Sequence, residues 1–182
     1  MAEFAAFLRG VNVGRAHRVG SAELRGCFEE QGLCEVDTFR TSGNVVFDAS
    51  GDGVDELTER IEAGLEKALG YEVAVFLRTA EEVRAIAAQE PFPAAKIEHS
   101  KGKLQVSLLT KKPAAGARKS VLALATDEDS LAFGDRELYW LPSGGTMESD
   151  LDTKAIASLL GLSTMRTKNT VDQMAAKYFA EA

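Results

Sequence analysis

Cysteine and histidine are scarce in this chain, and their scarcity argues against several kinds of site. The 182 residues include two cysteines, Cys27 and Cys34, and two histidines, His17 and His99. Neither a Cys-x-x-Cys pair nor a cluster with metal-ligand spacing is present, so the sequence indicates no zinc knuckle, no redox dithiol and no metal. We expect reduced thiols, with Cys27 as a small core residue on one face of a helix.

Long apolar runs are also absent. The run from Phe4 to Leu8 ends at Arg9, far short of the roughly 18 apolar residues that span a bilayer. The N-terminal segment has no basic region followed by an apolar stretch, as a secretory signal would. We therefore expect a cytoplasmic protein without membrane contact.

Positive charge is the minority charge. The sequence carries 21 Lys and Arg against 28 Asp and Glu, which gives a net charge of −7. Residues 1–90 alone hold 9 basic and 17 acidic side chains. A mean field of this sign repels polyanions, so binding to bulk nucleic acid is disfavoured. A cluster of arginines within this acidic half is a local exception.

The signatures of several large protein classes are missing. The chain contains neither Gly-x-x-x-x-Gly-Lys-Ser/Thr nor Gly-x-Gly-x-x-Gly, the loops that hold nucleotides. It also lacks Gly-x-Ser-x-Gly, and Ser42 lies in a predicted hairpin turn, which disfavours a serine hydrolase. The basic and aromatic string of RNA-recognition sheets does not occur. The sequence identifies no cofactor.

What the sequence does contain is a regular succession of strands and helices. With 45% hydrophobic residues, the chain can bury a core without disulfides. The hydrophobic pattern of the first half predicts strands at 4–8, 36–41, 45–47 and 72–77 and helices at 21–31 and 54–69. A Gly-Asn turn joins the second and third strands into a hairpin. This order is that of a ferredoxin-like unit.

The second half repeats most of this pattern. It predicts helices at 79–89 and 113–125, strands at 104–108, 131–133 and 137–141, and two final helices that begin near Thr153 and before Val171. We therefore predict an α+β fold of two ferredoxin-like (βαββαβ-type) subdomains packed together, with a C-terminal helical extension. The predicted boundaries are 1–78 for the first subdomain and 79–182 for the second with the C-terminal helices.

The segment from Phe7 to Arg18 is the best candidate for a binding site. It follows the first strand and contains two glycines and three arginines but no acidic residue. Arginine holds phosphate or carboxylate with two parallel hydrogen bonds, and glycine lets the backbone approach an anion closely. Cations before the last helix suit an anion bound at its N-terminus. We predict an anion site framed by Arg9, Asn12, Arg15, Arg18, Ser42, Asn44, Arg166 and Lys168.

The sequence leaves three functions open. The first is binding of a small anionic ligand, which includes phosphate, a nucleotide or the end of a nucleic acid. The second is an enzyme of nucleotide or phosphoryl chemistry with His17 as acid or base. The third is a structural or protein-interaction role, in which these residues stabilise the joint between the two halves. In that case Arg9 pairs with an acidic neighbour and Asn12 only forms a turn.

Four segments together resemble the bacterial domain of unknown function 1697 family. They are Phe7-Leu8-Arg9-Gly10-Val11-Asn12-Val13-Gly14, Ser42-Gly43-Asn44-Val45-Val46-Phe47, Pro91-Phe92 and Thr164-x-Arg166-x-x-Asn169-Thr170-Val171. The resemblance implies a cytoplasmic bacterial protein with two ferredoxin-like halves and no established activity. The chain departs from the family pattern at Arg15, where a second glycine is usual, and at Thr167-Lys168, where Asn-Trp is usual.

Overall fold

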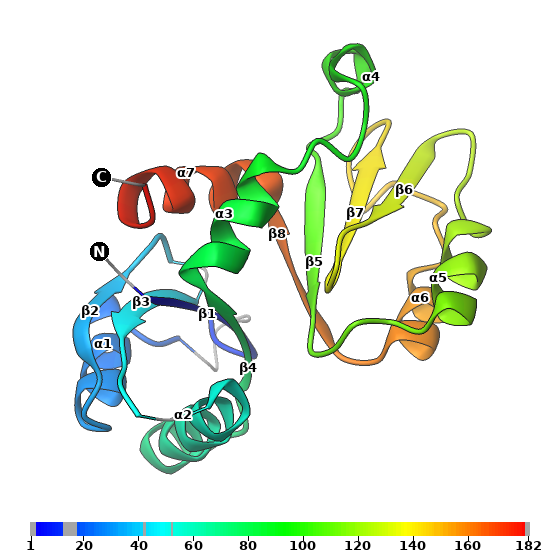
Figure 1. Cartoon of the computed structure of the whole chain (residues 1–182). Helices are drawn as coiled ribbons and strands as arrows, with labels where there is room; N and C mark the ends of the chain where they lie inside the picture. Colours follow the sequence, from blue (N-terminus) through cyan, green and yellow to red (C-terminus); the bar gives the residue numbers. More distant parts are fainter. Residues whose placement is uncertain (1–2, 13–17, 42, 52, 181–182) are drawn as a thin grey trace. The chain divides into compact units, whose positions relative to one another are not determined.

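The chain forms two compact units. The computed structural model describes residues 3–12, 18–41, 43–51 and 53–180 (Figure 1). Unit 1 comprises Met1–Arg84 and Met174–Ala182, and unit 2 comprises Ala85–Gln173. The boundaries fall inside helices α3 (Ala80–Ala88) and α7 (Lys168–Tyr178), so both helices contribute residues to both units. The contacts place the first boundary after Arg84, beyond the expected residue 78, and group Met174–Ala182 with unit 1.

Unit 1 is built on a four-stranded antiparallel sheet with the order β2-β3-β1-β4. Along the chain its elements are β1 (Phe4–Arg9), α1 (Ser21–Glu29), β2 (Cys34–Thr38), β3 (Asn44–Asp48), α2 (Val54–Leu69) and β4 (Ala74–Thr79). The central strand β1 sets Ala6 opposite Val45 on one side and opposite Leu77 on the other. This order and pairing define a ferredoxin-like unit.

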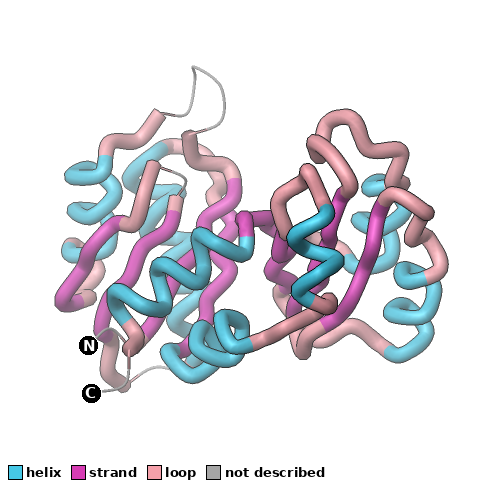
Figure 2. Tube along the Cα trace, turned by 90° about the horizontal axis from the view of Figure 1, so that it is seen from above, coloured by secondary structure: helices cyan, strands magenta, loops and turns pink. Residues whose placement is uncertain are grey.

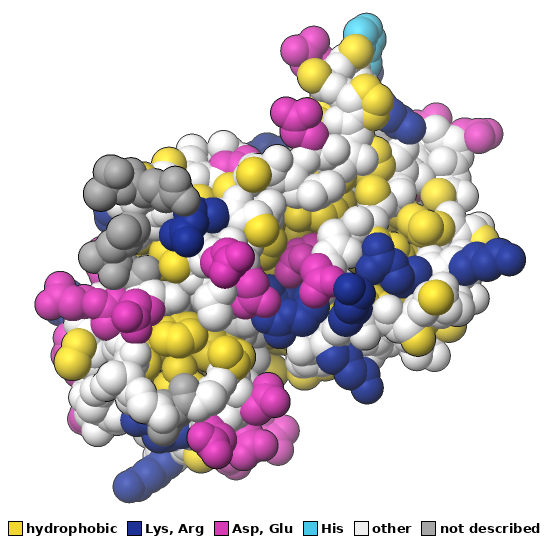
Figure 3. Space-filling model, in the orientation of Figure 1, with side chains coloured by type: hydrophobic (Ala, Val, Ile, Leu, Met, Phe, Trp, Pro, Cys, Tyr) yellow, Lys and Arg dark blue, Asp and Glu magenta, His cyan; other side chains and the backbone are white. Residues whose placement is uncertain are grey.

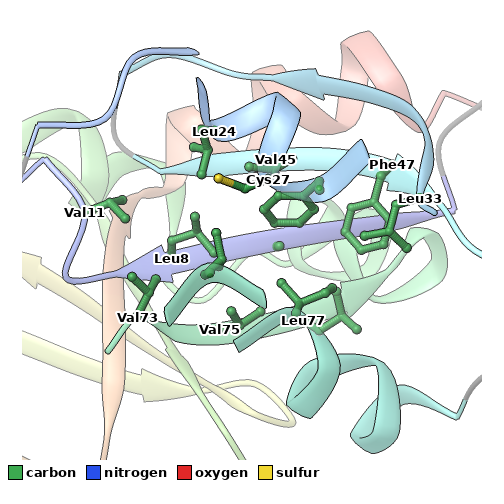
Figure 4. Packing of buried hydrophobic residues seen from close by; sticks show 14 of the residues in the cluster. Leu8, Val11, Leu24, Cys27, Leu33, Val45, Phe47, Val73, Val75 and Leu77 are labelled. Carbon is green, nitrogen blue, oxygen red and sulfur yellow. The ribbon is translucent and has the colours of Figure 1, made fainter. Parts of the chain in front are cut away.

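The core of unit 1 lies between one face of the sheet and helices α1 and α2. Figure 4 shows Leu8, Val45 and Val75 of the sheet facing Leu24 and Cys27 of α1. The helices form where their apolar residues recur at helical spacing, as at Leu57, Ile61 and Leu65 of α2, which are all at most 1% exposed. Cys27 is a buried, unbonded thiol, as predicted.

The opposite face of this sheet is buried as well. Phe7, Val46 and Phe76 alternate with the core residues along their strands, and none is more than 1% exposed. Ferredoxin-like sheets that bind RNA stack bases on exposed aromatic rings of this kind of face. The burial of Phe7 and Phe76 removes those rings from any such role.

Unit 2 repeats the topology of unit 1. Its elements are β5 (Gln105–Leu109), α5 (Ala115–Leu122), β6 (Asp129–Phe133), β7 (Glu137–Pro142), α6 (Thr153–Leu160) and β8 (Ser163–Thr167). The antiparallel sheet has the order β6-β7-β5-β8, with the strands in the same relative places as in unit 1. Figure 2 shows the helices of both units in cyan and their strands in magenta. The predicted α+β fold with two ferredoxin-like halves is confirmed.

Two elements of unit 2 were not predicted. Strand β8 has the sequence Ser-Thr-Met-Arg-Thr and lies at the edge of its sheet, where a short polar strand has little hydrophobic alternation. Helix α4 (Ala94–His99) follows Pro93 and buries none of its residues, so no apolar stripe marks it. Both omissions concern elements with few buried side chains.

A buried carboxylate organises one end of the unit 2 sheet. Asp129 is 1% exposed. Its Oδ1 accepts hydrogen bonds from Trp140 Nε1 at 2.7 Å and Ser149 Oγ at 2.9 Å, and its Oδ2 accepts one from Thr126 Oγ1 at 3.0 Å. A buried charge is tolerated when its oxygens are hydrogen-bonded in this way. Asp129 therefore joins β6, β7 and the loop before α6.

Replacing Asp129 by alanine should destabilise unit 2 by about 3 kcal/mol. The substitution leaves the indole N–H of buried Trp140 without its acceptor, and such losses cost about 1–3 kcal/mol each. Urea unfolding followed by the fluorescence of Trp140, the single tryptophan, measures the effect. The matched control is Asp127→Ala at an exposed neighbouring position, for which we expect a change below about 0.5 kcal/mol. Equal effects of the two substitutions would contradict this role.

The helices show whether a membrane-spanning segment is present in the described part of the chain. Within the ranges given above, the structure has no helix of the length and apolarity required to cross a bilayer.

Candidate functional site

A pocket of about 500 Å³ lies in unit 1 beside the start of helix α1. Three segments surround it: the loop after β1, the first turn of α1 and the turn between β2 and β3. Its described lining consists of Asn12, Arg18, Val19, Gly20, Ser21, Leu24, Thr38, Arg40, Thr41 and Gly43. This volume falls within the range of pockets that hold small ligands.

The charge of the pocket is opposite to the charge of the chain. Arg18 and Arg40 belong to the described lining, which contains no Asp or Glu, although the whole chain has a net charge of −7. On the face shown in Figure 3, acidic and basic side chains are interspersed, so positive charge does not dominate that surface. An acid-free pocket with two arginines is therefore a local feature that favours an anion.

The two arginines reach the pocket from different segments. Arg18 is exposed just before α1, and no described residue forms a hydrogen bond or ion pair with it. Arg40 is exposed in the turn after β2, and its guanidinium carbon lies 5.5 Å from the centre of the Phe39 ring. The Phe39 ring thus helps to hold the Arg40 guanidinium beside the pocket. The two side chains can thus approach one ligand from two walls.

Helix α1 adds backbone donors to the same pocket. Its N-cap is Gly20, an extended residue with φ −71° and ψ 154° that offers no side-chain cap, and Ser21 is its first residue. The first N–H groups of a helix have no partner within the helix and carry the positive end of its dipole. Both Gly20 and Ser21 line the pocket. An anion bound here could accept hydrogen bonds from these amides and from the Ser21 hydroxyl.

Asn12 holds the walls of the pocket together. Its Nδ2 donates to the Thr41 carbonyl at 2.7 Å, and its Oδ1 accepts from the Val19 N–H at 3.0 Å. Asn12 has a φ of 56°, a left-handed conformation that asparagine adopts more readily than most residues. The side chain therefore crosses from the loop to the hairpin and to the start of α1. Asn12 is a positioning residue rather than a bare turn former.

Replacing Asn12 by alanine should destabilise unit 1 by about 2 kcal/mol, because it removes both hydrogen bonds and strains the left-handed backbone. Asn12→Gly removes the same bonds without the strain, so its cost should be smaller. Thermal unfolding of the three proteins by circular dichroism measures the difference. If Asn12→Ala unfolds at the temperature of the original chain, the bridging role is wrong.

The hairpin wall depends on a close backbone turn. Arg40 has a φ of 59° and Gly43 a φ of 68°, and the Leu8 N–H donates to the Gly43 carbonyl at 2.7 Å. A side chain at Gly43 would place its Cβ 2.5 Å from Val11 Cγ2, which belongs to the core. Left-handed non-glycine residues are uncommon and cluster at functional sites. The turn therefore fits tightly against β1 and sets Thr41 and Arg40 at the pocket.

The structure brings part of the predicted site together. Asn12 and Arg18 line the pocket. Arg9 is exposed at the end of β1 and is not among the lining residues, and Asn44 is 1% exposed with its Nδ2 donating to the Phe39 carbonyl at 3.0 Å. Asn44 thus fixes the hairpin from inside. Three further predicted residues, Arg15, His17 and Ser42, lie outside the described residues.

The two cations predicted near the last helix belong to unit 2. Arg166 is on β8, where it donates to Thr164 Oγ1 and the Met165 carbonyl, each at 2.9 Å, and burial lowers the pKa of Arg166 to about 10. Lys168 starts α7 and is 8% exposed. Its Nζ donates to the Ala87 carbonyl at 2.8 Å and to Asp172 at 2.6 Å. Both of these partners lie within the protein and bind the ammonium group, so we do not assign Lys168 to the anion site.

Sequence reasoning missed Arg40, Thr38 and Thr41. It placed residues 36–41 in one strand, whereas β2 ends at Thr38 and the chain then turns. The signal that could have identified them is their position directly before the Ser42-Gly43-Asn44 turn, which was itself assigned to the site.

The described residues contain no cluster of His, Cys, Asp or Glu that could hold a metal ion. A second pocket of about 460 Å³ in unit 2 has the opposite charge, since five of its lining residues are acidic: Asp127, Glu128, Asp129, Glu148 and Asp150. Of these two pockets, the one with the basic described lining therefore belongs to unit 1.

Fold and site define a chain of two ferredoxin-like α+β units, the first of which contains a basic pocket. The chain belongs to the family described as "Protein of unknown function (DUF1697)", whose model matches residues 1–139. The solved structure of conserved bacterial protein SP0830 from Streptococcus pneumoniae is similar, with a TM-score of 0.70 and 23% identity over 97% of this chain and 99% of that chain. This similarity concerns the fold alone. Comparison with curated proteins gives no match.

Proposed function

We propose that this protein binds a small ligand through a phosphate or carboxylate group in the unit 1 pocket. The observation that carries the proposal is the pocket's composition: two arginines, a helix N-terminus and no acidic residue in its described lining. A charge-assisted hydrogen bond contributes about 1.5–3 kcal/mol, so two arginines can support specific binding. Arg18 and Arg40 are assigned to the anionic group.

The rest of the pocket suits a ligand larger than a bare ion. Thr38, Thr41 and Ser21 provide hydroxyl groups that donate or accept hydrogen bonds, while Val19 and Leu24 provide apolar contact. A volume of about 500 Å³ accommodates a sugar phosphate or a mononucleotide. Phosphorylated metabolites and 5′-phosphate ends of short oligonucleotides therefore form the first group to test.

The enzymatic and the purely structural alternatives make different demands. The enzymatic alternative uses His17 as the acid or base, and His17 lies outside the described residues. No described residue therefore favours phosphoryl chemistry over binding. A structural role requires the pocket arginines to be consumed internally. Arg18 has no such partner among the described residues, which favours a ligand.

A thermal-shift screen tests the proposal. The probes are inorganic phosphate, sugar phosphates, mononucleotides, dicarboxylates and a 5′-phosphorylated dinucleotide. A ligand at 100 times its dissociation constant adds about 2.7 kcal/mol of stability, which is readily detected. We expect at least one phosphorylated probe to raise the unfolding temperature in the original chain and to do so less in Arg18→Gln. The Arg9→Gln variant is the comparison, because Arg9 lies outside the lining. A screen without any stabilising anion would contradict the proposal.

A further inference from the structure

The last turn of α7 contacts the strand that leads into the pocket. The Tyr178 hydroxyl donates a hydrogen bond to Asp37 Oδ2 at 2.6 Å. Asp37 lies on β2 directly before Thr38, which lines the pocket. Residues 141 positions apart in the sequence are thus joined within unit 1.

A series of ring contacts continues from Tyr178 to the pocket. The Tyr178 ring meets the Phe39 ring edge-on, with 6.0 Å between the centroids and an interplanar angle of 86°. The Arg40 guanidinium lies 5.5 Å from the centroid of the same Phe39 ring. Edge-to-face ring pairs and cations near aromatic rings are both attractive arrangements. Phe39 is therefore held by Tyr178 and in turn contacts the pocket arginine.

Charge complementarity stabilises this contact. Lys177 Nζ donates to the Tyr178 hydroxyl at 2.6 Å and lies 3.7 Å from Asp37 Oδ2. The Tyr178 hydrogen bond, with the nearby Lys177 charge, holds the pKa of Asp37 below its ordinary value, whereas burial and the Asp37 charge raise the pKa of Tyr178. At neutral pH the tyrosine is thus the donor and the aspartate the charged acceptor.

The end of α7 is fixed in place by a buried residue. Phe179 is 0% exposed, and its carbonyl accepts a hydrogen bond from Arg84 Nη1 at 3.4 Å. The buried Phe179 therefore anchors the end of α7 and keeps the neighbouring Tyr178 against β2. Residues 168–173 of the same helix belong to unit 2, so α7 is an element that both units share.

We infer that Tyr178 is a positioning residue for the anion pocket: it holds Phe39, and through Phe39 it holds the turn that carries Arg40. Its effect on affinity rests on the proposed function, whereas its effect on the turn exists without any ligand. The inference gives the C-terminal helix a role in binding although no α7 residue is among the described lining residues.

Hydrogen exchange in the unliganded protein tests the effect on the turn. The Phe39 N–H donates to the Asn44 carbonyl at 2.9 Å, and its exchange rate reports opening of the hairpin. We expect Tyr178→Ala to raise this rate at least tenfold. Tyr178→Phe keeps the ring contact and should restore most of the protection. Ala176→Ser, at an exposed position of the same helix, should leave the rate unchanged. An unchanged rate in Tyr178→Ala overturns the inference.

Titration with inorganic phosphate tests the effect on affinity. We expect the dissociation constant to rise about fivefold in Tyr178→Ala and less than twofold in Tyr178→Phe, measured well below the unfolding temperature of each variant. Equal affinity in Tyr178→Ala and the original chain contradicts the inference. If the original chain binds neither phosphate nor any other anion, the proposed function fails, and the positioning of a ligand-binding arginine fails with it. The exchange result then separately decides whether Tyr178 holds the turn.

Discussion

Replacing Arg18 and Arg40 together by glutamine is expected to weaken anion binding at least 100-fold. Both side chains line the unit 1 pocket, and losing two charge-assisted hydrogen bonds costs about 3–6 kcal/mol of binding free energy. Glutamine retains much of the side-chain length, so the walls should keep their packing. Isothermal titration of the double variant with the best anion from the screen gives the result.

The control for this prediction removes the same amount of charge from the same unit. Arg25 and Lys67 are exposed on α1 and α2 and do not line the pocket. The Arg25→Gln, Lys67→Gln double variant should change affinity less than threefold at physiological salt, where exposed charges are screened beyond about 8 Å. If the two double variants lose affinity equally, the net charge of unit 1 governs binding and the pocket does not.

Replacing Gly43 by alanine should destabilise unit 1 by about 3 kcal/mol. The new Cβ would lie 2.5 Å from Val11 Cγ2 and 3.2 Å from Leu8 Cβ, and the φ of 68° is unfavourable for alanine. Overpacking against a core residue costs about 1–3 kcal/mol, and the backbone strain adds to it. Because the turn carries Arg40 and Thr41, anion affinity should fall as well. Chemical unfolding and phosphate titration measure the two effects.

Gly26 provides a control of the opposite sign. It lies inside α1, and a Cβ there would meet nothing within 4 Å. Gly26→Ala should stabilise the helix by about 0.5–1 kcal/mol, since alanine has the higher helix propensity. If Gly43→Ala is as well tolerated as Gly26→Ala, the turn does not pack as closely against β1 as described.

The elements with strong hydrophobic patterns could be predicted from the sequence. Helix α2 was predicted with its observed bounds because its apolar residues keep one buried stripe between Val54 and Leu69. Strand β8 was missed because it is a polar edge strand, and without it the second half looked incomplete. The secondary-structure elements could therefore be predicted wherever their buried apolar residues recur at a regular spacing in the sequence.

The site could be predicted only in part, because a sequence shows neither the contacts of a charged side chain nor the backbone conformation of a turn. An arginine-rich loop without acids drew attention to a segment from which Asn12 and Arg18 line the unit 1 pocket. A sequence reveals a charge but not what the charge contacts, so Lys168 was included although Ala87 and Asp172 occupy its ammonium group. Arg40 was placed inside a strand because nothing in its side chain reveals a φ of 59°.

The most direct test of the anion pocket is a phosphate titration followed by backbone amide NMR. We expect saturable shifts concentrated at Asn12, Val19–Leu24 and Thr38–Gly43, and their loss in the Arg18→Gln, Arg40→Gln variant. Saturable shifts centred elsewhere, or no saturable shift at all, would contradict it.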